Sequence, residues 1–255
     1  MSARPNFFIA IRLACPAFAD AVVAVQDQAV QRAPHLGKCR MQKTKLHLTG
    51  FVLSLDNADL VNRAGRCLEE FQDDLNKMMS SLESKEVYFN SLGAFTNKVL
   101  FASPVESDTV DILTKLVTQL EERFVEQGLL NDAKLAKNSW QPHATVLKTS
   151  YDRKNGSKLK INPQDYEGLD IYLQRPAGLS SSDALTNESL LEETGWSNEN
   201  TKGDAAIMVE STPVHGSTVA VGQQGICVPL TTLDLLSMQE VQADGYYKSY
   251  AQIFF

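Results

Sequence analysis

Long apolar runs, paired cysteines and a secretion signal are all missing from this chain. Its 255 residues include no apolar run of about 18 residues, so no membrane-spanning helix is predicted. The N-terminus has an apolar stretch of only about seven residues and no small-residue cleavage site after a basic region, unlike a secretory signal. The cysteines form no CxxC pair, which favours free thiols in a reducing compartment, the cytoplasm or the nucleus. They are Cys15, Cys39, Cys67 and Cys227.

Metal-ligand spacing and an excess of positive charge are also lacking. No group of Cys and His residues has the spacing of a metal site, so we expect neither a metal nor another cofactor. The net charge of -7 argues against a sequence-independent grip on long nucleic acid, which needs a basic surface. Two local basic groups remain, at residues 38–45 and 153–160. Each can hold a short anionic ligand, although ordinary solvated surface is the simpler interpretation for most of these side chains.

The order of the predicted elements indicates an α+β fold. Short β-rich runs alternate with longer amphipathic runs, which favours antiparallel strands with helices packed outside. The predicted strands cover 6–13, 45–53, 87–95, 98–104, 143–150, 231–238 and 246–255, and the predicted helices begin at Pro16, Ala58 and Val110. The helix from Ala58 is expected to run unbroken to about Met78, and Gly93 is expected to serve the bend between the two middle strands. From about residue 168 to 220 the chain is polar, acidic and rich in Ser and Asn, which predicts a flexible insertion in a single domain over 1–255.

Two of the four histidines lie in matching short segments. The stretch KLHLTGF contains His47 and Thr49, and the stretch PHATVLK contains His143 and Thr145, at or near the start of a predicted strand in each case. Residues i and i+2 of a strand point to the same face, so each histidine shares a face with its threonine. The same alternation predicts that Phe51 and Leu147 lie on those faces as well. A structural interpretation, with both histidines simply bonded to nearby carbonyl groups, stays open.

A third, weaker copy of this pattern occurs at His215, which has Ser217 two residues later. Serine can replace threonine as a hydroxyl donor. We give this copy little weight because it adjoins the polar insertion and has no apolar run that would place it in the framework of strands and helices.

Paired histidines beside hydroxyl groups suit the cleavage of a phosphodiester. That reaction needs one group to take a proton from the attacking oxygen and another to give a proton to the leaving oxygen. Histidine titrates close to neutrality, so two imidazoles can hold opposite protonation states. A hydroxyl donor beside each histidine can stabilise the charge that gathers on the phosphoryl oxygens. Two His-x-Thr strands facing one cleft therefore supply an acid, a base and two donors without a metal.

With these segments the sequence resembles the 2H (two-histidine) phosphoesterase superfamily. More narrowly, it is similar to the 2′,5′-RNA-ligase-like central domain of gamma-type A-kinase anchoring proteins. The matching stretches follow one another in the family's order: RPNFFIAIRL, HLTGFVLSL, SLGAFTNKVLFA, FVEQGLL, SWQPHATVLK, RKNG, INPQDYE, LDLLSM and DGYY. They run from Arg4 to about Phe254 and leave out the polar insertion, which is longer than the family pattern suggests. A kinase-anchoring helix is not evident, so we do not expect that activity to carry over.

The resemblance implies a bilobal fold with two antiparallel sheets lining a central groove. It implies that catalysis rests on His47, Thr49, His143 and Thr145, with no metal, and leaves open which histidine is the acid and which the base. Aromatic residues in the matching stretches are candidates for stacking on a base, and two lysines are candidates for phosphate contact, although core packing and solvated charge are the alternatives. These substrate-binding candidates are Phe95, Trp140, Tyr246 with its neighbour Tyr247, Lys45 and Lys148.

The expected function is therefore a metal-independent phosphodiesterase acting on short 2′,5′-linked oligonucleotides such as 2′,5′-oligoadenylate. Within the same chemistry, a 2′,3′-cyclic phosphate or a cyclic dinucleotide with a 2′,5′ linkage is an alternative substrate. A nucleotide-binding module without turnover, for example an AMP sensor, and a scaffold acting through the acidic insertion are the alternatives of other classes. Neither a membrane nor a long nucleic acid is an expected partner, and protein partners are not indicated.

Overall fold

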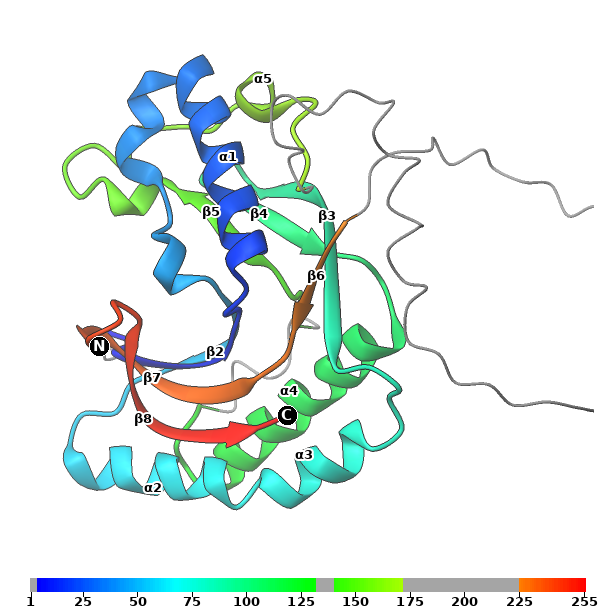
Figure 1. The fold of residues 1–255 in the computed structure, drawn as a ribbon. Helices are drawn as coiled ribbons and strands as arrows, with labels where there is room; N and C mark the ends of the chain where they lie inside the picture. Colours follow the sequence, from blue (N-terminus) through cyan, green and yellow to red (C-terminus); the bar gives the residue numbers. More distant parts are fainter. Residues whose placement is uncertain (1–3, 132–139, 172–224) are drawn as a thin grey trace, which may run out of the picture. The chain divides into compact units, whose positions relative to one another are not determined.

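The computed structural model describes residues 4–131, 140–171 and 225–255 (Figure 1). The predicted insertion, apart from residues 168–171, lies outside these ranges, and so does His215. Strands are β1 (Phe7–Arg12), β2 (His47–Leu53), β3 (Glu86–Phe95), β4 (Val99–Pro104), β5 (Ala144–Lys148), β6 (Ile226–Pro229), β7 (Thr232–Val241) and β8 (Tyr247–Phe254). Helices are α1 (Pro16–Arg32), α2 (Ala58–Glu69), α3 (Gln72–Met79), α4 (Asp108–Glu126) and α5 (Pro163–Tyr166). Short 3₁₀ turns cover η1 (Pro34–Cys39), η2 (Lys43–Lys45) and η4 (Thr149–Tyr151).

The first helix follows from its sequence. Pro16 occupies its first turn, where the missing N–H costs nothing and the fixed φ suits the helix. The apolar residues that recur with helical period are all buried against the sheet: Phe18, Ala21, Val22, Val25 and Ala29. Helix α1 therefore confirms the expectation from hydrophobic periodicity.

The predicted long helix from Ala58 is two helices, α2 and α3. The chain leaves helical order between Glu69 and Gln72, and Phe71 at the junction is 2% exposed. The Gln72 side chain donates to the backbone oxygen of Phe254 at 2.8 Å and accepts from the backbone N–H of the same residue at 2.9 Å. This tertiary contact with the end of β8 accompanies the break, and a periodicity argument within one segment has no access to it.

All eight described strands belong to one sheet of order β6-β3-β4-β5-β2-β1-β7-β8, with every neighbouring pair antiparallel. The prediction of two separate sheets is wrong. Strands β2 and β5 pair through Leu48 and Ala144 and so join the two halves of a single sheet. Only residues 230 and 231 separate β6, at one edge, from β7, near the other edge. The sheet is therefore strongly curved, and Figure 1 shows β6 and β7 as one continuous curved path.

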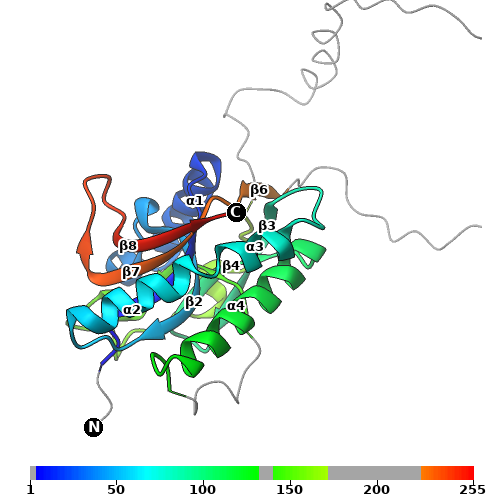
Figure 2. The same ribbon diagram turned by 90° about the horizontal axis from the view of Figure 1, so that it is seen from below.

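The helices cover one face of this sheet. Side chains from α1 to α4 form one large buried cluster with alternate residues of the strands, including Ile9, Leu53 and Val87. Helices α2, α3 and α4 lie together beneath one part of the sheet, as Figures 1 and 2 show. The opposite face carries a small apolar cluster around Phe8 and Leu236. No helix in the described ranges is long and apolar enough to cross a membrane.

A β-bulge follows each His-x-Thr segment. The predicted alternation is therefore wrong for the residues beyond it, Phe51 and Leu147. Between Thr49 and Val52 the strand β2 has one residue more than its partner β1, so Phe51 turns into the main core and is 7% exposed. Gly50 lies in this bulge, where an added Cβ would come within 3.2 Å of the Ile9 carbonyl oxygen. Strand β5 has the same irregularity beyond Thr145, and Leu147 is likewise fully buried in the main core.

The bend between β3 and β4 lies at residues 96–98 and not at Gly93, which is inside β3. Thr96 has a φ of 53°, the left-handed conformation that such a tight bend requires. An added Cβ at Gly93 would lie 2.5 Å from Cζ of Phe101, the residue opposite it on β4. The glycine therefore makes room for the ring of Phe101 to lie across the sheet.

Candidate active site

The two His-x-Thr segments meet where the halves of the sheet join. Leu48 of β2 pairs with Ala144 of β5 in antiparallel register, and both are fully buried. Extending this register by one residue in each direction sets each histidine opposite the threonine of the other segment. The flanking residues are all partly exposed, as expected for the face that the helices leave uncovered. They are His47 and Thr49 on β2, and His143 and Thr145 at β5.

The two imidazole rings are oriented by the same kind of hydrogen bond, to the backbone carbonyl two residues earlier. Nδ1 of His47 lies 2.7 Å from the carbonyl oxygen of Lys45, and Nδ1 of His143 lies 2.8 Å from that of Gln141. A carbonyl oxygen only accepts, so Nδ1 of each ring carries the proton and donates it. In the neutral ring the lone pair is then on Nε2, which can accept a proton from a bound molecule.

Aromatic rings from β1 and β8 flank His47. The centroid of its ring lies 5.2 Å from that of Phe8 on β1 and 5.6 Å from that of Tyr247 on β8, which stands edge-on. The ammonium group of Lys45 lies 4.9 Å from the centroid of the Tyr247 ring. Lys45 thus contributes a charge near this histidine as well as the carbonyl that holds it.

His143 has an aromatic setting of its own, built from β3 and β4. The rings of Phe95 and Phe101 are stacked with centroids 4.3 Å apart, and both make T-shaped contacts with the His143 ring, at 4.8 Å and 5.4 Å. Phe95, a candidate for stacking on a base, thus lies beside this histidine. Phe101 shares this contact, and only its alternation along the strand KVLFASP could have indicated it.

The charge state of the pair follows from burial and from Lys148. Burial lowers the pKa of His47 to about 4; the hydrogen bond to Lys45 opposes this effect, while positive charge on His143 and Lys148 adds to it. Burial also lowers the pKa of His143, the bond to Gln141 opposes the lowering, and Lys148 adds to it. Both rings are therefore neutral at pH 7 in the unliganded protein. Lys148 is exposed and close enough to influence the pKa of both rings.

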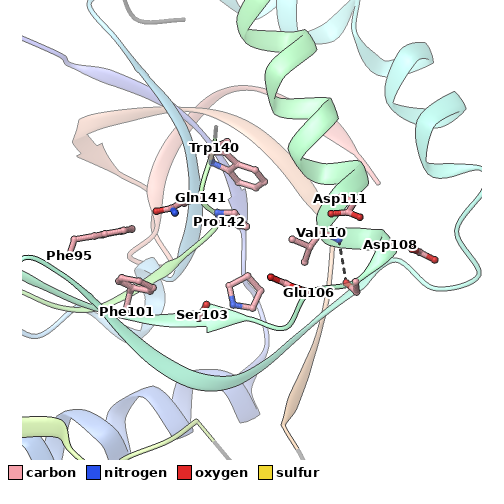
Figure 3. Close-up of a pocket in the computed structure, with 12 residues that line it drawn as sticks. Phe95, Phe101, Ser103, Glu106, Asp108, Val110, Asp111, Trp140, Gln141 and Pro142 are labelled. Atoms are coloured by element: carbon pink, nitrogen blue, oxygen red, sulfur yellow. Dashed lines mark hydrogen bonds between the residues drawn. The ribbon is translucent and has the colours of Figure 1, made fainter. Parts of the chain in front are cut away.

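Trp140 links the two segments directly. Its indole N–H donates to the backbone oxygen of Thr49 at 2.7 Å. This hydrogen bond connects the segment that precedes β5 to β2. The indole is partly buried against the main core, so positioning is its evident contribution. The ring also borders a pocket, which leaves one part of it accessible (Figure 3).

Tyr246 does not offer a free ring face. It is 1% exposed, the guanidinium carbon of Arg12 lies 4.3 Å from its ring centroid, and burial raises the pKa of its hydroxyl. Its neighbour Tyr247 is the residue that reaches His47. Arg12 lies directly opposite His47 in the β1–β2 register and is ion-paired with Asp244 at 2.7 Å. No sequence pattern indicated Arg12, because its place depends on the pairing of β1 with β2.

Three comparisons place the chain among known proteins. Residues 5–183 match the family model described as the AKAP7 2′5′ RNA ligase-like domain. Human A-kinase anchor protein 7 isoform gamma is 29% identical over 167 residues, which cover 64% of this chain and 47% of that protein. The match therefore spans about half the length of this curated relative.

Two solved structures were matched over almost their whole length. One is Escherichia coli LigT complexed with 3′-AMP, with 12% identity, 98% coverage of both chains and a TM-score of 0.45. The other is the TT0787 protein of Thermus thermophilus, with 15% identity, coverage of 98% of this chain and 97% of that one, and a TM-score of 0.46.

Proposed function

Because the chain belongs to the AKAP7 2′5′ RNA ligase-like family, we propose that it is a phosphodiesterase that cleaves 2′,5′-linked oligonucleotides with two histidines and no metal. The observation that carries this proposal is the mirrored pair at the β2–β5 joint. Nδ1–H of each histidine donates to a backbone carbonyl oxygen, and each histidine lies opposite the threonine of the other segment. One phosphate between the rings would meet two Nε2 atoms and two hydroxyl groups.

The electrostatic surroundings favour His47 as the base and His143 as the acid. Burial is the main cause that lowers the pKa of His47 to about 4, and positive charge on His143 or Lys148 adds to it, so this ring stays unprotonated into the acidic range. Burial and Lys148 also lower the pKa of His143, but less strongly than that of His47. A bound phosphodiester brings negative charge that raises both pKa values, and the ring that is easier to protonate takes up the proton first.

The proposed step balances without a further reactant. At a 2′,5′ linkage the free 3′-hydroxyl attacks the adjacent phosphorus, and Nε2 of His47 takes its proton. The bond from phosphorus to the 5′-oxygen breaks, and Nε2–H of His143 protonates that oxygen as it leaves. Thr49 and Thr145 donate to the phosphoryl oxygens as charge develops, and Lys148 neutralises part of it. The products are a 2′,3′-cyclic phosphate and a 5′-hydroxyl end.

Chromatography of reaction products tests this proposal. The substrates are 2′,5′-oligoadenylate, a nucleoside 2′,3′-cyclic phosphate and a cyclic dinucleotide with one 2′,5′ linkage, each incubated with the protein in EDTA. Cleavage of the first substrate supports the proposal, and preferential cleavage of either of the others moves the assignment to that substrate. If none of the three substrates is cleaved, the proposal that the protein is a phosphodiesterase is refuted.

A nucleotide-binding module without turnover is the second candidate, and one observation favours it. Both histidines have lowered pKa values, so the unliganded site holds no ready general acid at pH 7. Binding of AMP that is detectable by calorimetry, together with no cleavage between pH 5 and 8, would support this alternative. A rate that falls in both His47→Ala and His143→Ala would exclude it.

A further inference from the structure

The two basic groups of the sequence lie together in the structure. They occupy residues 38–45 and 153–160, far apart in the chain, and η1, which overlaps the first group, packs against η4, which leads into the second. The ring of His35 lies 3.4 Å from the carbonyl oxygen of Lys160. In Figure 1 the two groups are the blue and the light-green turns beside α1 and β5. The fold therefore makes one surface out of two sequence motifs.

This surface is strongly positive in a chain whose net charge is -7. Residues 34–46 and 152–161 each contain four Lys or Arg, eight of the 24 in the chain, and together they contain one acid. Among the described residues, only Arg40 of these eight is in an ion pair, with Asp27. The other seven residues are called the basic surface: Lys38, Lys43, Lys45, Arg153, Lys154, Lys158 and Lys160.

Backbone contacts fix the second half of the basic surface. The single acid, Asp152, is 7% exposed, and its carboxylate accepts from the backbone N–H groups of Lys154 at 3.0 Å and Asn155 at 3.1 Å. The ammonium group of Lys98 donates to three carbonyl oxygens of residues 156–159, at 2.6–3.5 Å. None of these hydrogen bonds uses a charged side chain of the basic surface. The turn is therefore ordered while its cations still face solvent, which lowers the cost of binding an anion.

The basic surface begins at the two histidines. The carbonyl of Lys45 accepts from His47, and Lys43 is two residues earlier, so its Cα lies at most about 14 Å from that of His47. On the other strand, Lys148 lowers the pKa of both histidines, and the Cα of Arg153 lies at most about 18 Å from that of Lys148. A chain of phosphates with one member at the histidines can therefore continue onto this surface.

One exposed aromatic ring lies between the histidines and the distal cations. Tyr151 is 37% exposed, and its hydroxyl donates to Sδ of Met41 at 3.6 Å. Burial is the main cause that raises the pKa of this hydroxyl, and the proximity of Tyr247, which flanks His47, adds to it. Cations interleaved with an accessible ring suit single-stranded nucleic acid, whose bases stack while its phosphates pair. Tyr151 is the only exposed large apolar side chain of these segments, which disfavours insertion into a membrane.

We propose that the basic surface binds the backbone phosphates of a single-stranded oligonucleotide beyond the reacting phosphate, so that the protein prefers substrates with several phosphates to dinucleotides. This inference rests on the proposed function to the extent that the reacting phosphate is taken to lie at the histidines. Phosphate contacts carry no base information, so the preference is for length and not for sequence.

Binding of deoxyadenylate oligomers tests this inference without cleavage, because they have no hydroxyl group beside the phosphate. Fluorescence anisotropy of a labelled hexamer and a labelled dimer gives their affinities as a function of salt. We expect the hexamer to bind at least about tenfold more tightly than the dimer at low salt, since each phosphate contact of a single strand releases counterions.

Two double substitutions with the same change of net charge locate the contacts. Lys38→Gln/Lys154→Gln removes one cation from each half of the basic surface. It should weaken hexamer binding about five- to tenfold and reduce the slope of log K against log salt by about 1.4. Lys77→Gln/Lys115→Gln, the matched control, removes two exposed cations beside α3 and α4 and should change neither value.

Each result assigns a separate fate to the two proposals. Equal affinities for hexamer and dimer, or equal effects of the two double substitutions, overturn the assignment of the basic surface. The same holds if Lys38→Gln/Lys154→Gln weakens binding to phosphatidylserine vesicles and leaves hexamer binding unchanged, because the surface then serves a membrane. If hexamer binding is as expected but 2′,5′-oligoadenylate is not cleaved, the basic surface stands and the phosphodiesterase proposal fails. Cleavage without a length preference reverses that conclusion.

Discussion

Replacing Gly93 by alanine should separate the placement of His143 from the stability of the fold. The added Cβ would lie 2.5 Å from Cζ and 2.7 Å from Cε2 of Phe101. Ordinary contacts of a Cβ begin near 3.4 Å, so the edge of the ring must retreat by about 0.9 Å. The ring is stacked on Phe95 at 4.3 Å and lies 5.4 Å from His143, so this displacement reaches the histidine directly.

The expected effects on stability and on activity differ in size. Overpacking typically costs about 1–3 kcal/mol, and the loss of glycine freedom in the unfolded chain returns about 0.4–1 kcal/mol. The net loss in the free energy of unfolding should therefore be roughly 1–2 kcal/mol. Displacement of a catalytic group by about 1 Å can lower the rate about a hundredfold, so kcat/KM for 2′,5′-oligoadenylate should fall about 10- to 100-fold.

Urea denaturation and initial-rate kinetics of the same samples measure both effects. Gly37→Ala is the control, because its added Cβ would have only Val30 Cγ1, at 3.9 Å, as a neighbour. In a Phe101→Leu background the clash is gone, and Gly93→Ala should cost less than about 0.5 kcal/mol of additional stability. An equal cost of Gly93→Ala in both backgrounds would refute the proposed role of the Phe101 ring.

Three further predictions concern the charges and contacts of the site. Lys148→Met removes a positive charge that lowers both histidine pKa values, so the alkaline limb of the pH profile of kcat/KM should move to higher pH; an unmoved limb would contradict the assigned electrostatics. Trp140→Phe loses the 2.7 Å bond to Thr49 and should lower the free energy of unfolding by about 1 kcal/mol in urea titrations, and an unchanged midpoint would show that this bond contributes nothing. His47→Gln should lose less stability than the wild type as pH falls from about 6.5 toward about 4, because in that window the unfolded chain binds a proton at His47 that the folded chain does not; parallel stability curves would argue against the lowered pKa.

Local sequence patterns identified the elements that carry the site. The His-x-Thr stretches lie at the starts of β2 and β5, as alternation and strand propensity predicted. The last two strands, β7 and β8, pair as an antiparallel hairpin around the turn before Tyr246, which confirms the closing pair. These features are determined within segments of about ten residues, where period and turn residues are informative.

The features that sequence reasoning missed depend on contacts between segments. The bulge after Thr49 turns Phe51 into the core, and alternation alone assigns it to the other face. The direct pairing of Leu48 with Ala144 makes one sheet out of the two that were expected. Tyr246 is buried in a cluster with Phe8 and Leu236, and Arg12, far away in the chain, packs over its ring. In each case the partner strand decides the outcome, and a single strand contains no information about its partner.

Cleavage of a 2′,5′-linked adenylate trimer beside its 3′,5′ isomer, in EDTA, tests the central claim most directly. The wild-type protein should cleave the 2′,5′ trimer much faster than its isomer, and His47→Ala and His143→Ala should each lower the rate by about a hundredfold or more. Two correctly folded histidine variants that retain the wild-type rate would show that the imidazoles at the β2–β5 joint do not perform the reaction.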